Sequence, residues 1–239
     1  MNIEGRNVLI TGASRGLGRT LAFACVEAGA RQVFAGARRT EDLQSLKSGG
    51  ITPIKLDVTN DDDVAATREL GAIDLLINNA GIAGYGNPIS MDFAAAVEEM
   101  NVNYFGALRM SRALAPQMFE RGEGMIVNIA TAFAKINLPI VATYCASKAA
   151  LLSLGQALRA YLKDTGVHVM TVMPTTFDSD MSKGADVPKM TKEFVAGEIL
   201  RHIREESIDP PIGDEAEGVL KGLRDDPIAL EKMLANIRA

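Results

Sequence analysis

The chain has 239 residues, of which 47% are hydrophobic and 23% are charged, and its formal net charge is −5. This length and apolar content suit one α/β domain with a large core, and the acidic balance without a basic stripe excludes a nucleic-acid footprint. Two cysteines, Cys25 and Cys145, are too few for a disulfide framework, and no signal peptide or run of about 20 apolar residues is visible. We therefore expect a cytoplasmic protein with no nucleic-acid and no membrane partner.

Short apolar segments alternate with segments of helical periodicity. The predicted strands cover 7–11, 32–36, 52–56, 73–78, 124–130 and 167–173. The predicted helices cover 17–29, 40–48, 61–70, 90–121 and 143–165, with an amphipathic helix at 227–238. This alternation predicts a single α/β domain over 1–239, with a doubly wound parallel sheet and helices on both faces. The irregular stretch 175–215 is predicted to be a lid over a substrate site, with a plain surface excursion as the alternative.

A glycine-rich turn joins the first predicted strand to the first predicted helix, and Thr11–Gly18 reads TGASRGLG. Gly12 suits a tight turn, Gly16 allows close approach of a pyrophosphate, and Gly18 allows close packing of helix on strand. The helix start then offers free N–H groups to phosphate. A flexible turn would explain the glycines alone, but the strand-to-helix context predicts a dinucleotide site. The other candidate contacts in this turn are Ser14, Arg15 and Leu17.

Tyr144 and Lys148 lie four residues apart in a segment of helical periodicity. Residues at i and i+4 share one face of a helix. A tyrosine hydroxyl titrates near about pH 10, and a neighbouring positive charge lowers its pKa. The pair is therefore a candidate general acid and base. The alternative is a half-buried tyrosine beside a solvated lysine.

Three motifs together carry a resemblance: TGASRGLG at Thr11–Gly18, the sequence NNAG at 78–81, and the Tyr144–Lys148 pair. In this order and spacing, from about residue 6 to about residue 181, the chain resembles the short-chain dehydrogenase/reductase family. The resemblance implies a Rossmann-type fold and a nicotinamide cofactor. It also implies hydride transfer between that cofactor and a small carbonyl or alcohol substrate.

The end of the second predicted strand indicates which nicotinamide cofactor is used. An acidic residue there would bind the ribose 2′-hydroxyl of NAD, whereas an arginine accommodates the 2′-phosphate of NADP. The chain has Ala37 followed by Arg38, and Arg15 adds a second cation, so we predict NADP(H). The alternative is that Arg38 and Arg39 are solvated surface charges. The resemblance adds further cofactor contacts at Asp57, Val58, Asn79, Ala80, Gly81, Tyr144, Lys148 and Pro174.

The resemblance also assigns catalytic roles. Tyr144 would exchange the proton, Lys148 would lower its pKa and hold the nicotinamide ribose, and an asparagine would extend a proton relay through water. The family pattern has glycine three residues after that asparagine, which selects Asn103 because of Gly106; Asn101 is the alternative. The hydroxyl that polarises the carbonyl is expected 13 residues before Tyr144.

That hydroxyl position is where the chain departs from the family, since it holds Thr131 in place of serine. Threonine keeps a hydroxyl but adds a methyl group, so we expect the role to survive in a narrower pocket. The alternative is a strand residue and impaired activity. A second departure is Thr175 after Pro174, where the family has glycine, which puts the nicotinamide contacts of this loop in doubt; Ser179 replaces a later threonine.

The C-terminal segment lacks the glycine-rich stretch of many family members. We therefore expect a homodimer through the long helices near 101–121 and 143–165, with a tetramer as the alternative. The segments expected to line the pocket, 83–86, 133–140 and 175–215, are mostly apolar and favour a ketone or aldehyde with a hydrophobic body. No cluster of His, Cys and Asp suggests a metal. The competing hypothesis is a non-catalytic NADP-binding redox sensor on the same fold.

Overall fold

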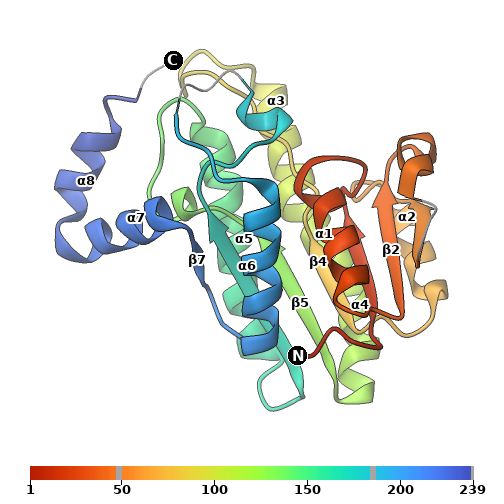
Figure 1. The fold of residues 1–239 in the computed structure, drawn as a ribbon. Coiled ribbons are helices and arrows are strands. Elements are labelled where there is room, and N and C mark those ends of the chain that lie inside the picture. Colours follow the sequence, from red (N-terminus) through yellow and green to blue (C-terminus); the bar gives the residue numbers. More distant parts are fainter. Residues whose placement is uncertain (47–49, 184–186, 238–239) are drawn as a thin grey trace.

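The computed structural model describes residues 1–46, 50–183 and 187–237. Within these residues the strands are β1 Asn7–Thr11, β2 Gln32–Ala37, β3 Ile51–Lys55, β4 Leu75–Asn78, β5 Gly124–Ile129, β6 Val167–Pro174 and β7 Pro211–Ile212. They pair in parallel in the order β3-β2-β1-β4-β5-β6-β7, with helices on both faces (Figure 1). The prediction of a doubly wound parallel sheet is confirmed. A strand such as β5, buried at every residue, is typical of a sheet covered on both sides.

The helical elements follow the predicted alternation, with several differences in detail. They are α1 Gly16–Glu27, η1 Thr40–Leu46, α2 Asp61–Ala66, η2 Thr67–Leu70, α3 Phe93–Met100, η3 Asn101–Gly106, α4 Ala107–Arg121, η4 Ala132–Ala134, α5 Ala142–Tyr161, η5 Asp180–Ser182, α6 Lys192–Glu205, α7 Asp214–Asp225 and α8 Pro227–Leu234. The predicted helix 90–121 is in fact α3 and α4 joined by the π-helix η3. The predicted helix 40–48 is a 3₁₀ helix, and the end of that prediction lies outside the described residues.

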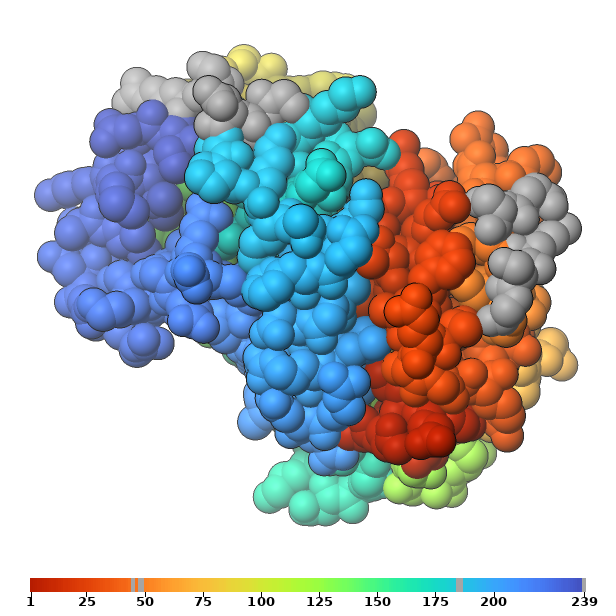
Figure 2. Space-filling view, in the orientation of Figure 1, coloured from red at the N-terminus to blue at the C-terminus, as the bar shows by residue number. Residues whose placement is uncertain are grey.

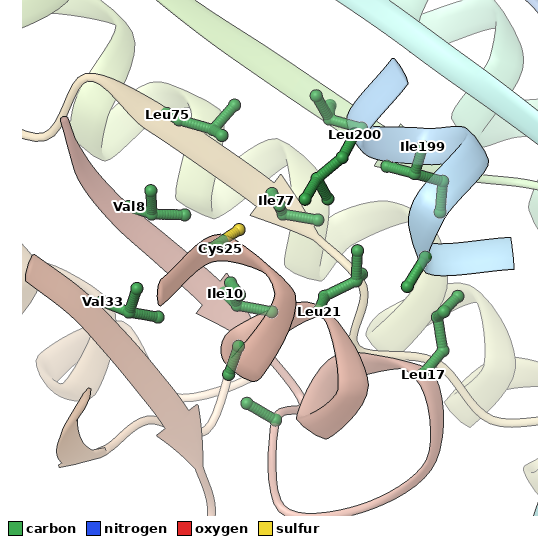
Figure 3. Close-up of a cluster of buried hydrophobic side chains, with 14 of the residues drawn as sticks. Val8, Ile10, Leu17, Leu21, Cys25, Val33, Leu75, Ile77, Ile199 and Leu200 are labelled. Carbon is green, nitrogen blue, oxygen red and sulfur yellow. The ribbon is translucent and has the colours of Figure 1, made fainter. Parts of the chain in front are cut away.

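The two faces of the sheet carry separate apolar clusters, because successive strand residues point to opposite sides. Val8 and Ile10 face the cluster that contains side chains of α1 and α6, as Figure 3 shows. Leu9 faces the other cluster, which contains side chains of α2 and α4. Figure 2 shows α6 lying beside α1 on the first face, although the two are far apart in sequence.

The expected lid over 175–215 is wrong for its second half. Residues 192–205 form α6, and Val195, Ile199 and Ile203 of this helix are fully buried in the core. These residues are four apart, which is close to the period of a helix. The sequence analysis missed this pattern because the neighbouring stretch is irregular and contains prolines. β7 then adds an edge strand to the sheet. For the described residues that precede α6, the lid stays a prediction.

The strand order reverses at β1, which lies between β2 and β4. In open parallel sheets a ligand binds outside the carboxyl ends of the strands at such a switch point. The turn after β1 is therefore the place where the fold itself puts a binding crevice. Separately, none of the helices in the described part of the chain has the length and apolar character needed to cross a membrane.

Candidate active site

The glycine-rich turn is packed tightly against the exit of β4. A β-carbon added at Gly12, whose φ is +67°, would lie 2.8 Å from Cα of Ala80, and one added at Gly18 would lie 2.4 Å from Nδ2 of Asn79. The Asn79 amide donates to the carbonyls of Thr11 and Gly12 at 2.9 and 3.1 Å. The NNAG motif thus fixes the shape of the turn. The Thr11 hydroxyl contributes as well, since it accepts hydrogen bonds from the backbone N–H groups of Asn79 and Ala80.

The start of α1 is open to an anion. Arg15 is its N-cap residue but makes no side-chain capping bond, and the first turn contains no acidic residue. A β-carbon added at Gly16 would meet nothing within 4 Å, so space lies directly above this turn. Free backbone N–H groups and the positive end of the helix dipole point there. These features fit the pyrophosphate of a dinucleotide; Leu17 is buried and offers only its backbone, and Ser14 is half-buried.

A free arginine follows the second strand. Ala37 ends β2, and no described residue forms an ion pair or hydrogen bond with the exposed Arg38 that follows it. The neighbouring Arg39 pairs with Asp42 at 2.9 Å, and Arg15 pairs with Asp180 at 3.3 Å between two exposed side chains. Such exposed pairs contribute little free energy. Arg38 is therefore available for a phosphate, and Arg15 can exchange its partner.

Asp57 and Val58, which follow Leu56 after the end of β3, lie at the same edge of the sheet. Asp57 uses Oδ1 to accept from the backbone and hydroxyl of Thr59 at 2.9 and 2.7 Å. Val58 is 6% exposed and packs against Gly106, since a β-carbon there would lie 2.6 Å from its Cγ2. The sequence predicted both as cofactor contacts, and their position at the carboxyl end of the sheet is compatible with that role.

The catalytic candidates meet where β5 ends and α5 begins. Nζ of Lys148 lies 5.7 Å from the ring centroid of Tyr144 and donates to the Ile129 carbonyl at 2.8 Å. Thr131, 5% exposed, follows β5, and its Oγ1 accepts from the Phe133 N–H at 3.3 Å. No described residue accepts the Thr131 hydroxyl proton, so it is free to donate to a substrate oxygen.

The pKa shifts of the pair differ from the expected pattern. Burial raises the pKa of Tyr144, with smaller contributions from Cys145, Tyr85 and Glu99. Burial also lowers the pKa of Lys148 to about 8. Loss of solvation is thus the main cause of both shifts. That Lys148 lowers the pKa of Tyr144 during the reaction stays a prediction. Tyr144 is held as the neutral phenol, the form that can donate a proton.

Asn103 is 1% exposed, and its side chain is fully engaged. Its Oδ1 accepts from the backbone N–H of Ile82 at 2.9 Å, and its Nδ2 donates to the Ile82 carbonyl and to Oγ of Ser147 at 2.9 and 2.8 Å. These bonds connect the loop after β4 to α5 through Asn103. Its part in a proton relay through water stays a prediction. The alternative, Asn101, is half-buried and accepts a hydrogen bond from Arg109.

Ser147 is a site residue that the sequence analysis missed. It is fully buried, donates to the Tyr144 carbonyl at 2.7 Å and accepts from Asn103. It therefore joins the π-helix η3 to the first turns of α5. Its place three residues after Tyr144 was the available signal, because residues three apart lie on the same face of a helix.

The backbone after β6 accommodates the second sequence departure. Pro174 ends β6, and Thr175 is 7% exposed without a positive φ, so this position does not require glycine. Ser179 caps η5 in a reciprocal pair with Ser182. Within the described residues, no group of three or more His, Cys, Asp or Glu side chains could hold a metal ion.

Comparison with known proteins agrees with this geometry. A family model described as short chain dehydrogenase matches residues 6–189. This chain belongs to the short-chain dehydrogenase/reductase family of oxidoreductases. A crystal structure of a short chain dehydrogenase from Burkholderia cenocepacia J2315, in complex with NADP, is 37% identical. It superposes with a TM-score of 0.93, covering 98% of this chain and 99% of that one.

Two curated relatives of the family differ in how much of their length is matched. A dehydrogenase/reductase SDR family protein 7-like of Drosophila melanogaster is 34% identical over 198 residues, which cover 77% of this chain but 60% of that protein. An NADP-dependent 3-hydroxy acid dehydrogenase of Schizosaccharomyces pombe is 30% identical over 193 residues, 75% of this chain and 74% of that protein. The family assignment predicted from the three motifs is confirmed.

Proposed function

We propose that this short-chain dehydrogenase/reductase uses NADP(H) to interconvert a small carbonyl compound and its alcohol, with Tyr144 as general acid and base. The observation that carries the proposal is the half-buried Tyr144 with the buried Lys148 close to its ring, together with the free hydroxyl proton of Thr131 at the end of β5. The nicotinamide cofactor supplies or accepts the hydride. The remaining chemistry, orientation and proton transfer, falls to residues of this chain.

Each of these residues has a role that its contacts support. Thr131 donates a hydrogen bond from its hydroxyl to the carbonyl oxygen and so polarises the carbonyl group. Tyr144, kept neutral by burial, gives its proton to the same oxygen. The ammonium of Lys148, held by the Ile129 carbonyl, stabilises the phenolate that forms. In the oxidative direction the same groups act in reverse.

The surroundings of Tyr144 support an apolar substrate. Tyr144 packs against an apolar cluster of Phe133, Leu138 and Met173, to which the C-terminal helices α7 and α8 add Val219 and Leu230. Such a wall favours a ketone or aldehyde with a hydrophobic body. α7 and α8 form the lobe beside the sheet in Figure 1, so only their share of this wall comes from a part of the chain that the sequence did not predict for it.

The test of the proposed activity is Tyr144→Phe, assayed by NADPH consumption with aldehydes, ketones and quinones. Because the phenol is the proton donor, we expect turnover to fall by about 100-fold or more, with the NADPH dissociation constant unchanged. Tyr161→Phe, at an exposed position of the same helix, is the matched control. A Tyr144→Phe protein that still turns over at the normal rate would show that another group transfers the proton. Binding of NADPH without consumption by the unmodified protein would favour the redox-sensor hypothesis.

The choice of NADP(H) is tested by Arg38→Asp. Loss of a charge-assisted contact with the 2′-phosphate should raise the NADPH dissociation constant by about 10- to 100-fold, while NADH binding improves or stays constant. Arg39→Asp is the control, since Arg39 already pairs with Asp42. An equal effect of the two substitutions, measured by cofactor titration, would mean that only the overall charge of this edge matters.

We also propose that the protein acts as a homodimer in the cytoplasm, with a tetramer as the alternative assembly. Apolar side chains are exposed along the expected interface: Phe105 of η3 is 45% exposed and Phe119 of α4 is 51% exposed. A second copy of this surface would cover both.

A further inference from the structure

The burial pattern of α3 is the reverse of the one that the hydrophobic effect favours. Phe93 and Val97 are 81% and 52% exposed, whereas Glu99, 1% exposed, is the one residue of this helix that is buried. A carboxylate is almost never fully buried unless its oxygens are bonded, because removing the charge from water is costly. A position that breaks the local rule so clearly usually serves the site nearby.

Both carboxylate oxygens of Glu99 have partners close to the catalytic tyrosine. Oε1 accepts from the backbone N–H of Gly84, and Oε2 accepts from the hydroxyl of Thr143, each at 2.5 Å. Gly84 belongs to the loop 82–86 after β4, and Thr143 directly precedes Tyr144. The first turn of α5 has no acidic residue and its N-cap has no side-chain capping bond, so the Glu99 carboxylate supplies negative charge at the positive end of that helix.

Glu99 repeats, one helical turn earlier, the contacts of Asn103. Asn103 joins the backbone of Ile82 to the hydroxyl of Ser147, and Glu99 joins the backbone of Gly84 to the hydroxyl of Thr143. The two bridging residues are four apart, and so are the two hydroxyl residues on α5. Together they form two parallel connections between the loop and α5, one on each side of Tyr144 along the chain.

We infer that Glu99 is a positioning residue for the reaction, which holds Tyr144 and the loop 82–86 in their relative places. The inference rests on the proposed role of Tyr144 as acid and base. The loop continues the connection, since Gly86 donates to the Ile140 carbonyl at 3.0 Å and Tyr85 donates to the Met181 carbonyl at 2.5 Å. Loss of the Glu99 contacts should therefore disturb the carbonyl site and leave the glycine-rich turn, which these contacts do not reach, unchanged.

Two substitutions of Glu99 separate the effect of its hydrogen bonds from the effect of its charge, and a third variant serves as control. Glu99→Ala removes both hydrogen bonds. Glu99→Gln keeps both, because the amide oxygen accepts from Gly84 and the amide nitrogen donates to the hydroxyl of Thr143. Glu98→Ala, at the exposed neighbouring position of the same helix, is the matched control.

With 4-nitrobenzaldehyde as the probe, Glu99→Ala should lower kcat by about 10- to 100-fold, the loss typical of a small displacement of a catalytic group. The NADPH dissociation constant should not change, and Glu99→Gln should stay close to the unmodified protein. Thr143→Val should lower kcat as well, and the double variant with Glu99→Ala should lose no more than the larger single loss, because the two residues share one contact. Normal kcat and KM in Glu99→Ala, or an equal loss in Glu99→Gln, would overturn the inference.

Amide hydrogen exchange gives a readout independent of turnover. Glu99→Ala should raise exchange in the loop 82–86 and in the first turns of α5, and Glu98→Ala should raise it in neither. Faster exchange throughout the sheet would show a general effect on stability and would also overturn the inference. Turnover retained in Tyr144→Phe would contradict the proposed function itself. An inactive Tyr144→Phe together with an unaffected Glu99→Ala would contradict this inference alone.

Discussion

At the scale of single residues, the buried lysine combines a hydrogen bond with a depressed pKa. Lys148 is 4% exposed, bonds the Ile129 carbonyl, and has a pKa lowered to about 8 by burial. Its ammonium is therefore mostly protonated at neutral pH and loses its charge as the pH rises through about 8. Tyr144 stays neutral over the same range because burial raises its pKa.

The opposite pKa shifts of Lys148 and Tyr144 predict that kcat for carbonyl reduction falls on the alkaline side of the pH profile. As Lys148 deprotonates above about pH 8, the phenolate loses its stabilising charge and kcat should fall. Lys148→Arg keeps its charge at these pH values. Its kcat will be lower at every pH, but the fall near pH 8 should disappear. A fall that persists in Lys148→Arg would assign it to another group.

At the scale of elements, the break in the predicted helix 90–121 shapes the site. The π-helix η3 between α3 and α4 carries both Asn103 and Gly106. A wider turn at this point directs Asn103 to the loop after β4 and brings the backbone of Gly106 against Val58. π-helical turns are common at functional sites, and here the turn connects the catalytic side to the proposed cofactor side.

The close contact at Gly106 predicts the effect of adding one methyl group. In Gly106→Ala the new β-carbon would lie 2.6 Å from Cγ2 of Val58, so overpacking should lower the free energy of unfolding by about 1 to 3 kcal/mol. Gly218→Ala in α7 is the control, because a β-carbon there would meet nothing within 4 Å and alanine is the better helix former. Urea unfolding of both variants measures the difference. Equal stability of the two would mean that Val58 moves aside freely.

At the scale of the whole molecule, three exposed phenylalanines lie on two different surfaces. Phe105 and Phe119 lie on the helices expected to form a dimer, whereas Phe194 lies on α6 beside α1. All three are between 45% and 51% exposed, so exposure alone does not distinguish them. What distinguishes them is the surface to which each belongs.

The dimer proposal predicts a molar mass near twice the 25.5 kDa of the chain in light scattering. A charge buried in an apolar interface is costly, so Phe105→Glu combined with Phe119→Glu should give monomers. Phe194→Glu should leave the dimer intact. Dissociation by Phe194→Glu alone would place the interface on the face of α1 and α6, and a mass near four chains would favour the tetramer.

The sequence by itself determined the family, the alternation of strands and helices as far as β6, and the residues of the TGASRGLG and NNAG motifs and the Tyr144–Lys148 pair. These features are local: apolar periodicity, glycine at a strand-to-helix turn, and an i, i+4 pair on one helix. The departures were also visible there, and in the structure Thr131 keeps a free hydroxyl proton and Thr175 has an ordinary backbone.

Only the tertiary structure decided which groups meet and how strongly they are buried. The depressed pKa of Lys148, the fully engaged amide of Asn103 and the core position of α6 all depend on neighbours distant in sequence. Glu99 shows the limit most clearly, because periodicity favours burying Phe93 and Val97, whereas the fold buries the carboxylate. Desolvation and hydrogen bonding between distant segments are properties of the packed chain, and no local pattern encodes them.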